Sequence, residues 1–94
     1  MSAVLENVYF DITMKVVNYA LEFVNQPGYA FLRITDLLDS LLALALEIKE
    51  VDKKEFYEKV KTKLKDRRNL NTPEERTAVL NEILSMYIEE WRGN

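Results

Sequence analysis

Residues 31–50 constrain the fold of this chain more than any other stretch. Their sequence, FLRITDLLDSLLALALEIKE, has the pattern of one long helix. At about 100° per residue the apolar side chains fill an arc of roughly 200°. They are Ile34, Leu37, Leu38, Leu41, Leu42, Leu44, Ala45, Leu46 and Ile48. A surface helix needs an apolar stripe only about 100° wide, so we expect this helix to pack on two sides within the core.

The composition favours a few long elements over many short ones. Only two glycines and two prolines occur among 94 residues, which leaves room for few turns, while 48% of the residues are hydrophobic. We expect a single helical domain over residues 1–94. The uncharged run at residues 40–46 is far shorter than the ~20 residues that a membrane-spanning helix needs, so we expect no membrane partner.

Absent residue types exclude several kinds of chemistry. The chain has no histidine and no cysteine, which excludes Ser-His-Asp catalysis, thiolate nucleophiles, disulfides and most zinc sites. No motif predicts a cofactor. No signal or transit peptide is readable, so we expect a cytoplasmic protein. The abundant Lys and Glu are typical of thermophilic proteins, although seven asparagines argue against that origin.

Periodicity and capping signals predict four helices, at about residues 3–25, 31–50, 53–68 and 73–91. Residues 25–28 (NQPG) break the first helix, Asp52 and Glu55 form a capping-box pattern, and Thr72, Pro73 and Glu75 form a second. Short connections favour antiparallel neighbours, so we predict an all-α bundle of four helices. An alternative is an α+β fold, because residues 60–65 alternate like a strand and could pair with residues 29–34.

The first predicted helix carries two apolar stripes. The main stripe is Leu5, Val8, Tyr9, Ile12, Val16, Tyr19, Ala20 and Phe23. A second stripe, Phe10, Met14, Val17 and Leu21, lies beyond an interruption at Glu6 and Thr13. Helix 53–68 is too polar to cover all this surface, so we expect a homodimer that buries the second stripe or part of helix 73–91. The leading hypothesis is a small non-catalytic helical protein that self-associates and binds a protein partner.

An acidic strip on helix 31–50 suggests one alternative function. Asp36 and Asp39, like Glu47 and Glu50, are spaced i, i+3, so each pair faces one way and is able to share a hard cation. In these pairs alone the chain resembles the all-α nucleotide pyrophosphatases, a resemblance that implies a Mg²⁺-dependent hydrolase. The Glu-x-x-Asp partner pair of that family is missing. The simpler interpretation is a solvated helix face.

A basic face on residues 53–68 suggests the other alternative. Residues 52–68 contain eight Lys or Arg and four Asp or Glu, hence 8 − 4 = +4, and Lys54, Lys61, Lys65 and Arg68 form one ridge. Such a ridge is able to bind nucleic-acid phosphates. However, this helix offers no Asn, Gln or Ser to read bases, and the whole chain has a net charge of −3. The simpler interpretation is a solvated helix face, or a set of salt-bridge partners for the acidic strip of a neighbouring helix.

Overall fold

The computed structural model describes residues 2–93 and confirms an all-α bundle of four helices. The elements are α1 (Ser2–Leu21), α2 (Gly28–Glu47), α3 (Lys54–Leu64), a 3₁₀ turn η1 (Arg67–Asn69) and α4 (Pro73–Arg92). No strand occurs among the described residues, and residues 29–34 and 60–64 are helical. The α+β alternative is therefore wrong.

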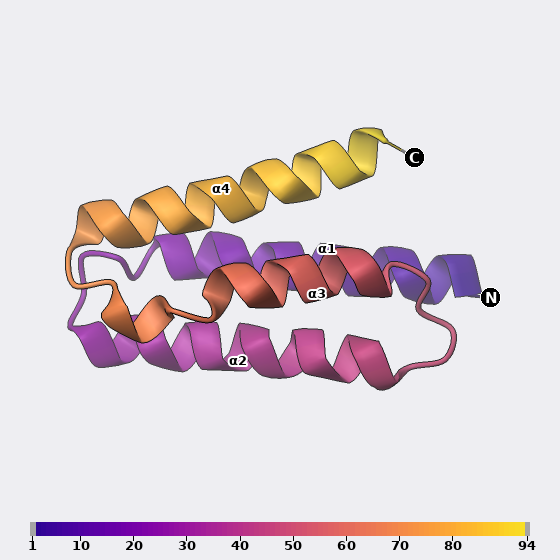
Figure 1. The fold of residues 1–94 in the computed structure, drawn as a ribbon, viewed down its shortest axis with the longest axis horizontal. Helices are drawn as coiled ribbons and strands as arrows, with labels where there is room; N and C mark the ends of the chain where they lie inside the picture. The colour runs from indigo at the N-terminus through magenta and orange to yellow at the C-terminus, as the bar shows by residue number, and fades with distance from the viewer. Residues whose placement is uncertain (1, 94) are drawn as a thin grey trace.

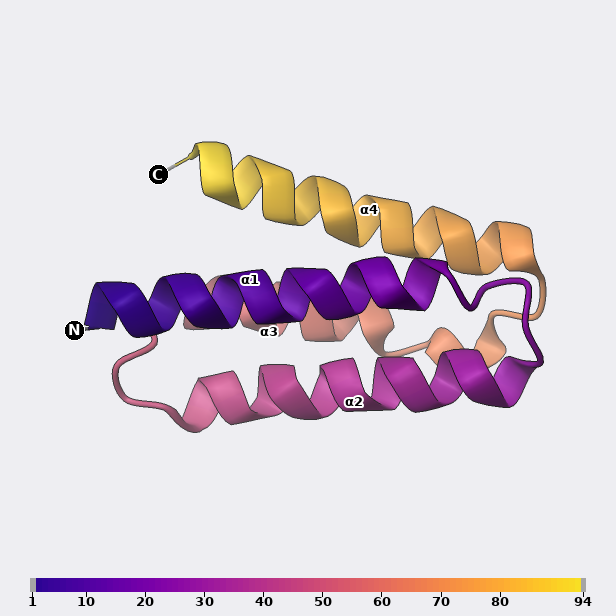
Figure 2. The same ribbon diagram turned by 180° about the vertical axis from the view of Figure 1, so that it is seen from behind.

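The four helices form a closed square of neighbours. Each helix packs on the next along the chain, and α4 returns to pack on α1. In Figure 1, α3 lies in front of α1, with α2 below and α4 above. Figure 2 shows the opposite side, where α1 lies in front and runs antiparallel to α2. The C-terminal half of α4 diverges from the bundle in both views.

The boundaries differ from the predicted ones where tertiary contacts act on the ends of helices. α1 ends at Leu21 and not near residue 25, and α2 begins at Gly28, directly after Pro27, and not at residue 31. α2 ends at Glu47 and not at residue 50, and the backbone of the next residue, Ile48, is extended. α3 ends at Leu64 and not at residue 68, and residues 67–69 form the 3₁₀ turn.

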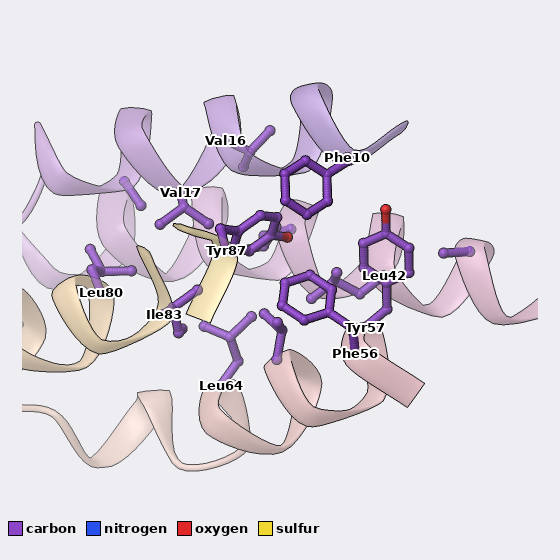
Figure 3. Packing of buried hydrophobic residues seen from close by; sticks show 14 of the residues in the cluster. Phe10, Val16, Val17, Leu42, Phe56, Tyr57, Leu64, Leu80, Ile83 and Tyr87 are labelled. Carbon is purple, nitrogen blue, oxygen red and sulfur yellow. The ribbon is translucent and has the colours of Figure 1, made fainter. Parts of the chain in front are cut away.

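The core is centred on aromatic rings from three helices. Tyr87 of α4 packs on Phe10 of α1, with ring centroids 5.0 Å apart, and on Phe56 of α3, at 4.8 Å. Figure 3 shows these rings beside aliphatic side chains such as Val17 and Ile83. Edge-to-face and tilted ring pairs of this kind add roughly 0.5–1.5 kcal/mol each beyond the burial of their area. The aromatic cluster therefore ties α3 and α4 to α1.

The two predicted capping boxes have different outcomes. At the start of α4 the box is confirmed: the Thr72 hydroxyl accepts from the Glu75 N–H, and the Glu75 carboxylate accepts from the Thr72 N–H. Bonds from the Asn71 and Thr72 N–H groups lower the pKa of Glu75. At the start of α3 the predicted box of Asp52 and Glu55 does not form, and the N-cap residue is Lys53 without a side-chain cap.

Candidate interaction surfaces

Part of the basic ridge pairs with part of the acidic strip of α2. Lys61 Nζ lies 3.0 Å from an Asp39 carboxylate oxygen. Arg67 donates from Nε and Nη2 to one Asp36 oxygen, at 3.1 and 2.6 Å, and Arg68 approaches the other oxygen at 3.5 Å. The interpretation of the ridge as a set of salt-bridge partners is confirmed for Lys61 and Arg68, and Arg67, which was not predicted, joins them.

The remaining residues of the predicted basic ridge and acidic strip do not take part in these ion pairs. Lys54 Nζ bonds the carbonyl oxygens of Ile48 and Val51 and so satisfies the chain just after α2. Lys65 is exposed just after α3, Glu47 is exposed at the end of α2, and Glu50 is exposed in the turn that follows α2. Within residues 2–93, no three acidic, His or Cys side chains converge where a metal ion would bind. The structure thus does not bring the four carboxylates of the hypothetical Mg²⁺ site together.

The stripe of α1 that we predicted as an interface belongs to the core of the protomer. Phe10 and Val17 are 5% and 0% exposed, and Met14 and Leu21 pack against the buried cluster. The prediction that a second copy of the chain buries this stripe is therefore wrong. α4 and α3 already cover it, because the rings of Tyr87 and Phe56 lie against Phe10.

Part of the main stripe of α1 is left uncovered, although Tyr9, Val16 and Ala20 of the same stripe are buried. Six large apolar side chains on α1 and α2 are between 37% and 51% exposed: Leu5, Val8, Ile12, Tyr19, Leu37 and Leu44. We call these six residues the apolar face. On α3, residues 54–64, no large apolar side chain is exposed. Most of the unburied hydrophobic surface therefore lies on α1 and α2, while α4 contributes Ile88 and Trp91, which are 46% and 72% exposed.

The members of the apolar face point to the same side of the bundle. In α2, Asp36 and Asp39 mark the flank that contacts α3. At 100° per residue, Leu37 and Leu44 lie on the other flank, the one nearer α1. In α1, Phe10 marks the flank toward α4, and Ile12 and its stripe lie on the flank toward α2. The apolar face is thus the outer side of the α1–α2 pair; in Figure 2 α1 lies in front and α2 lies below it.

Buried polar groups tie distant helices together. The Glu6 carboxylate is only 7% exposed and accepts from the backbone N–H groups of Asp52, at 2.6 Å, and Lys53, at 3.1 Å. Tyr57 donates to its other oxygen at 3.4 Å. Glu6 therefore acts as the N-terminal cap of α3, supplied from α1. The sequence signal was Glu6 itself, a charged residue inside an apolar pattern.

A second buried pair joins α1 to α4. The Tyr87 hydroxyl donates to Thr13 Oγ1 at 2.8 Å, and Thr13 donates to the Phe10 carbonyl at 3.1 Å. Burial raises the pKa of Tyr87, as it does for Tyr57, whose pKa the nearby Glu6 charge raises further. Burial also raises the pKa of Tyr9. These hydroxyls stay protonated and work as hydrogen-bond donors in the core.

A groove of about 720 Å³ lies between α3 and the C-terminal half of α4. Phe56 and Met86 contribute apolar surface to it. Five carboxylates and two lysines line the rest: Asp52, Glu55, Glu82, Glu89, Glu90, Lys53 and Lys59. Lys53 pairs with Glu90 at 2.9 Å, and Lys63 pairs with Glu82. The groove therefore combines an apolar patch with a negative lining.

Comparison with known proteins adds no relative from which a function would follow. The chain matches no family model, no curated protein and no solved structure.

Among the described helices, none has the length and the apolar character that a membrane-spanning helix needs.

Proposed function

We propose that the chain is a small, non-catalytic helical protein that self-associates through the apolar face and binds a protein partner through the α3–α4 groove. The observation that carries the proposal is the gathering of Leu5, Val8, Ile12, Tyr19, Leu37 and Leu44 on one side of the bundle, each 37–51% exposed. Exposed apolar patches of this kind mark sites of protein association.

The area of the apolar face suits a homodimer. A large apolar side chain presents on the order of 150–250 Å² when exposed, so six side chains that are roughly half exposed present about 500 Å². A specific interface buries about 1,000 Å² or more in total, hence about 500 Å² per copy. The apolar residues alone reach this value, before any polar rim is added. A second copy of the chain supplies the same apolar surface in return.

Self-association is tested by changing one central residue of the apolar face. Leu44→Lys places a charge in the face, and Lys forms helices nearly as well as Leu. We expect wild type to have the mass of a dimer by light scattering at micromolar concentration, and Leu44→Lys to have the mass of a monomer. Ile88→Lys is the matched control, because Ile88 is 46% exposed on α4, and should stay dimeric. A monomeric wild type refutes the proposal.

The lining of the groove indicates the chemistry of the partner. Its carboxylates outnumber its lysines by five to two, so a basic segment is electrostatically favoured. Its apolar patch at Phe56 and Met86 suits one apolar side chain of that segment. We infer that the partner presents a basic amphipathic helix, with Lys or Arg residues beside an apolar anchor.

A labelled synthetic peptide tests this partner chemistry. The probe is a helical Leu–Lys peptide, and its Leu–Glu analogue is the control ligand. Reversing two groove charges, Glu55→Lys with Glu89→Lys, should weaken binding of the Leu–Lys peptide at least tenfold by fluorescence anisotropy. The control variant, Glu22→Lys with Glu58→Lys, has the same net charge but changes residues outside the groove lining. If both variants lose the same affinity for the Leu–Lys peptide, the groove is not its specific binding site.

A further inference from the structure

Four exposed charges border the apolar face, two on each helix. Asp11 and Lys15 lie along the edge of α1 that is away from α2, and Arg33 and Glu47 lie along the edge of α2 that is away from α1. Within residues 2–93 none of the four takes part in an ion pair or a side-chain hydrogen bond. The apolar face therefore has a rim of unpaired charges. Protein interfaces commonly have this arrangement, an apolar centre surrounded by a polar rim.

The order of charges on α1 is self-complementary in an antiparallel pair. Asp11 and Lys15 are one helical turn apart and opposite in sign. A two-fold axis that crosses the helix midway between them, at the level of Thr13, places Asp11 of one copy against Lys15 of the other. The same operation creates the second pair, so both charges on each copy are matched.

The order of charges on α2 gives the same result independently. Arg33 and Glu47 are also opposite in sign, and the residue midway between them is Ser40. A two-fold axis at the level of Ser40 therefore places Arg33 of one copy against Glu47 of the other. It also places Leu37 of one copy near Leu44 of the other, because these two leucines lie almost symmetrically about Ser40.

One axis satisfies both helices, because Thr13 and Ser40 lie at the same height in the bundle. The Tyr9 hydroxyl bonds the Leu41 carbonyl and lies near the Ala45 carbonyl, so residue 9 is level with residues 41–45 of α2. The helices are antiparallel, so Thr13, one turn further along α1, is level with residues 37–41. That turn contains Ser40.

We propose that two copies pack their apolar faces together about a two-fold axis through the level of Thr13 and Ser40. α1 lies antiparallel to α1 of the second copy, and α2 lies antiparallel to α2. This arrangement rests on the proposed self-association and specifies its geometry. The apolar face forms the centre of the interface, and four ion pairs form its rim.

The other two-fold arrangement of the same faces brings like charges together. A two-fold axis parallel to the helices places α1 of one copy over α2 of the other, and each residue keeps its position along the helix direction. Asp11 is then nearer to Glu47 of the second copy than to Arg33, and Lys15 is nearer to Arg33 than to Glu47. Repulsion disfavours this packing, so the rim charges select the antiparallel arrangement.

Charge reversals on α1 distinguish the two arrangements. Lys15→Asp makes the α1 edge wholly acidic, and Asp11→Lys makes it wholly basic, so each should weaken dimerisation about tenfold at low salt. The double variant, Asp11→Lys with Lys15→Asp, should recover the wild-type dissociation constant, and an equimolar mixture of the single variants should form heterodimers. A double variant that dimerises more tightly than wild type supports the arrangement with parallel axes and overturns the proposal.

Cross-linking at the axis gives a second, independent readout. The chain lacks cysteine, so Ser40→Cys introduces a single thiol that should face its own counterpart between two helices whose axes lie about 8–10 Å apart. A short bis-maleimide should convert Ser40→Cys into a covalent dimer and leave Ser85→Cys, on α4, monomeric. A non-covalent dimer in which Ser40→Cys does not cross-link overturns this geometry alone, whereas monomeric variants and wild type overturn self-association itself.

Discussion

The contact of Glu6, a residue of α1, with the start of α3 leads to the most specific prediction about stability. Glu6→Ala removes a carboxylate that accepts from two backbone N–H groups at the start of α3 and from the Tyr57 hydroxyl. Because α3 has no cap of its own, these donors keep no protein partner. Glu6→Gln keeps one acceptor oxygen in nearly the same shape, removes the charge and replaces the second acceptor oxygen with an amide NH2 group.

The size of the effect follows from these bonds. Loss of a helix N-cap costs about 0.5–2 kcal/mol, and a hydrogen bond to a charged group contributes about 1.5–3 kcal/mol. We therefore expect Glu6→Ala to lower the free energy of unfolding by about 2–3 kcal/mol. For a domain of this size that corresponds to a melting temperature lower by roughly 10–20 °C. Glu6→Gln should lose about half as much.

The assay is urea unfolding followed by circular dichroism at one fixed protein concentration, because dimerisation would itself stabilise the fold. Glu22→Ala is the control, since Glu22 is exposed near the other end of α1, and should change the free energy by less than about 0.5 kcal/mol. Hydrogen exchange should also accelerate in α3 of Glu6→Ala before it does elsewhere. If Glu6→Ala is no less stable than Glu22→Ala, the cap contributes nothing and the reasoning is wrong.

Two further predictions concern the buried hydroxyls and the ion pairs. Burial raises the pKa of Tyr57 and Tyr87 in the fold above the value of about 10 that the unfolded chain has. Their stabilising effect is fully present well below pH 10 and is lost as the pH rises above it. Between pH 9 and 11 the two residues together should lose about 2.7 kcal/mol of unfolding free energy, which urea unfolding measures; a flat profile contradicts it. Asp36→Asn weakens the pairs with Arg67 and Arg68 and should cost about 1 kcal/mol, a difference that 1 M salt should reduce because the Asp36 side chain is 45% exposed. No change at low salt would show that these pairs do not stabilise the fold.

The sequence predicted the fold well because its helical periodicity and its breaks agree. The break at Pro27 and the capping box at Thr72 lie where α2 and α4 begin. The ends of α1 and α3 were predicted less accurately, because contacts from distant residues decide them. Arg67 bonds both the Leu64 carbonyl and Asp36 of α2, and no local pattern contains such a contact.

The main error was to assign the second stripe of α1 to an interface, and its cause is physical. Both of its stripes are apolar, so periodicity alone does not tell which one faces inward. Glu6 and Thr13 seemed to interrupt the inner stripe, because an unpaired polar group is costly to bury. In the fold both have partners from distant helices, Lys53 and Tyr57 for Glu6 and Tyr87 for Thr13. Those partners become visible only when the helices are assembled.

The most direct test of the central claim is an isotope-filtered NMR experiment on a mixture of labelled and unlabelled chains. Only contacts between copies give signals in that experiment. We predict intermolecular signals that join Leu37 of one copy to Leu44 of the other and Val8 to Tyr19. Intermolecular signals from other surfaces, or their complete absence at micromolar to millimolar concentration, would contradict the claim that a second copy covers the apolar face.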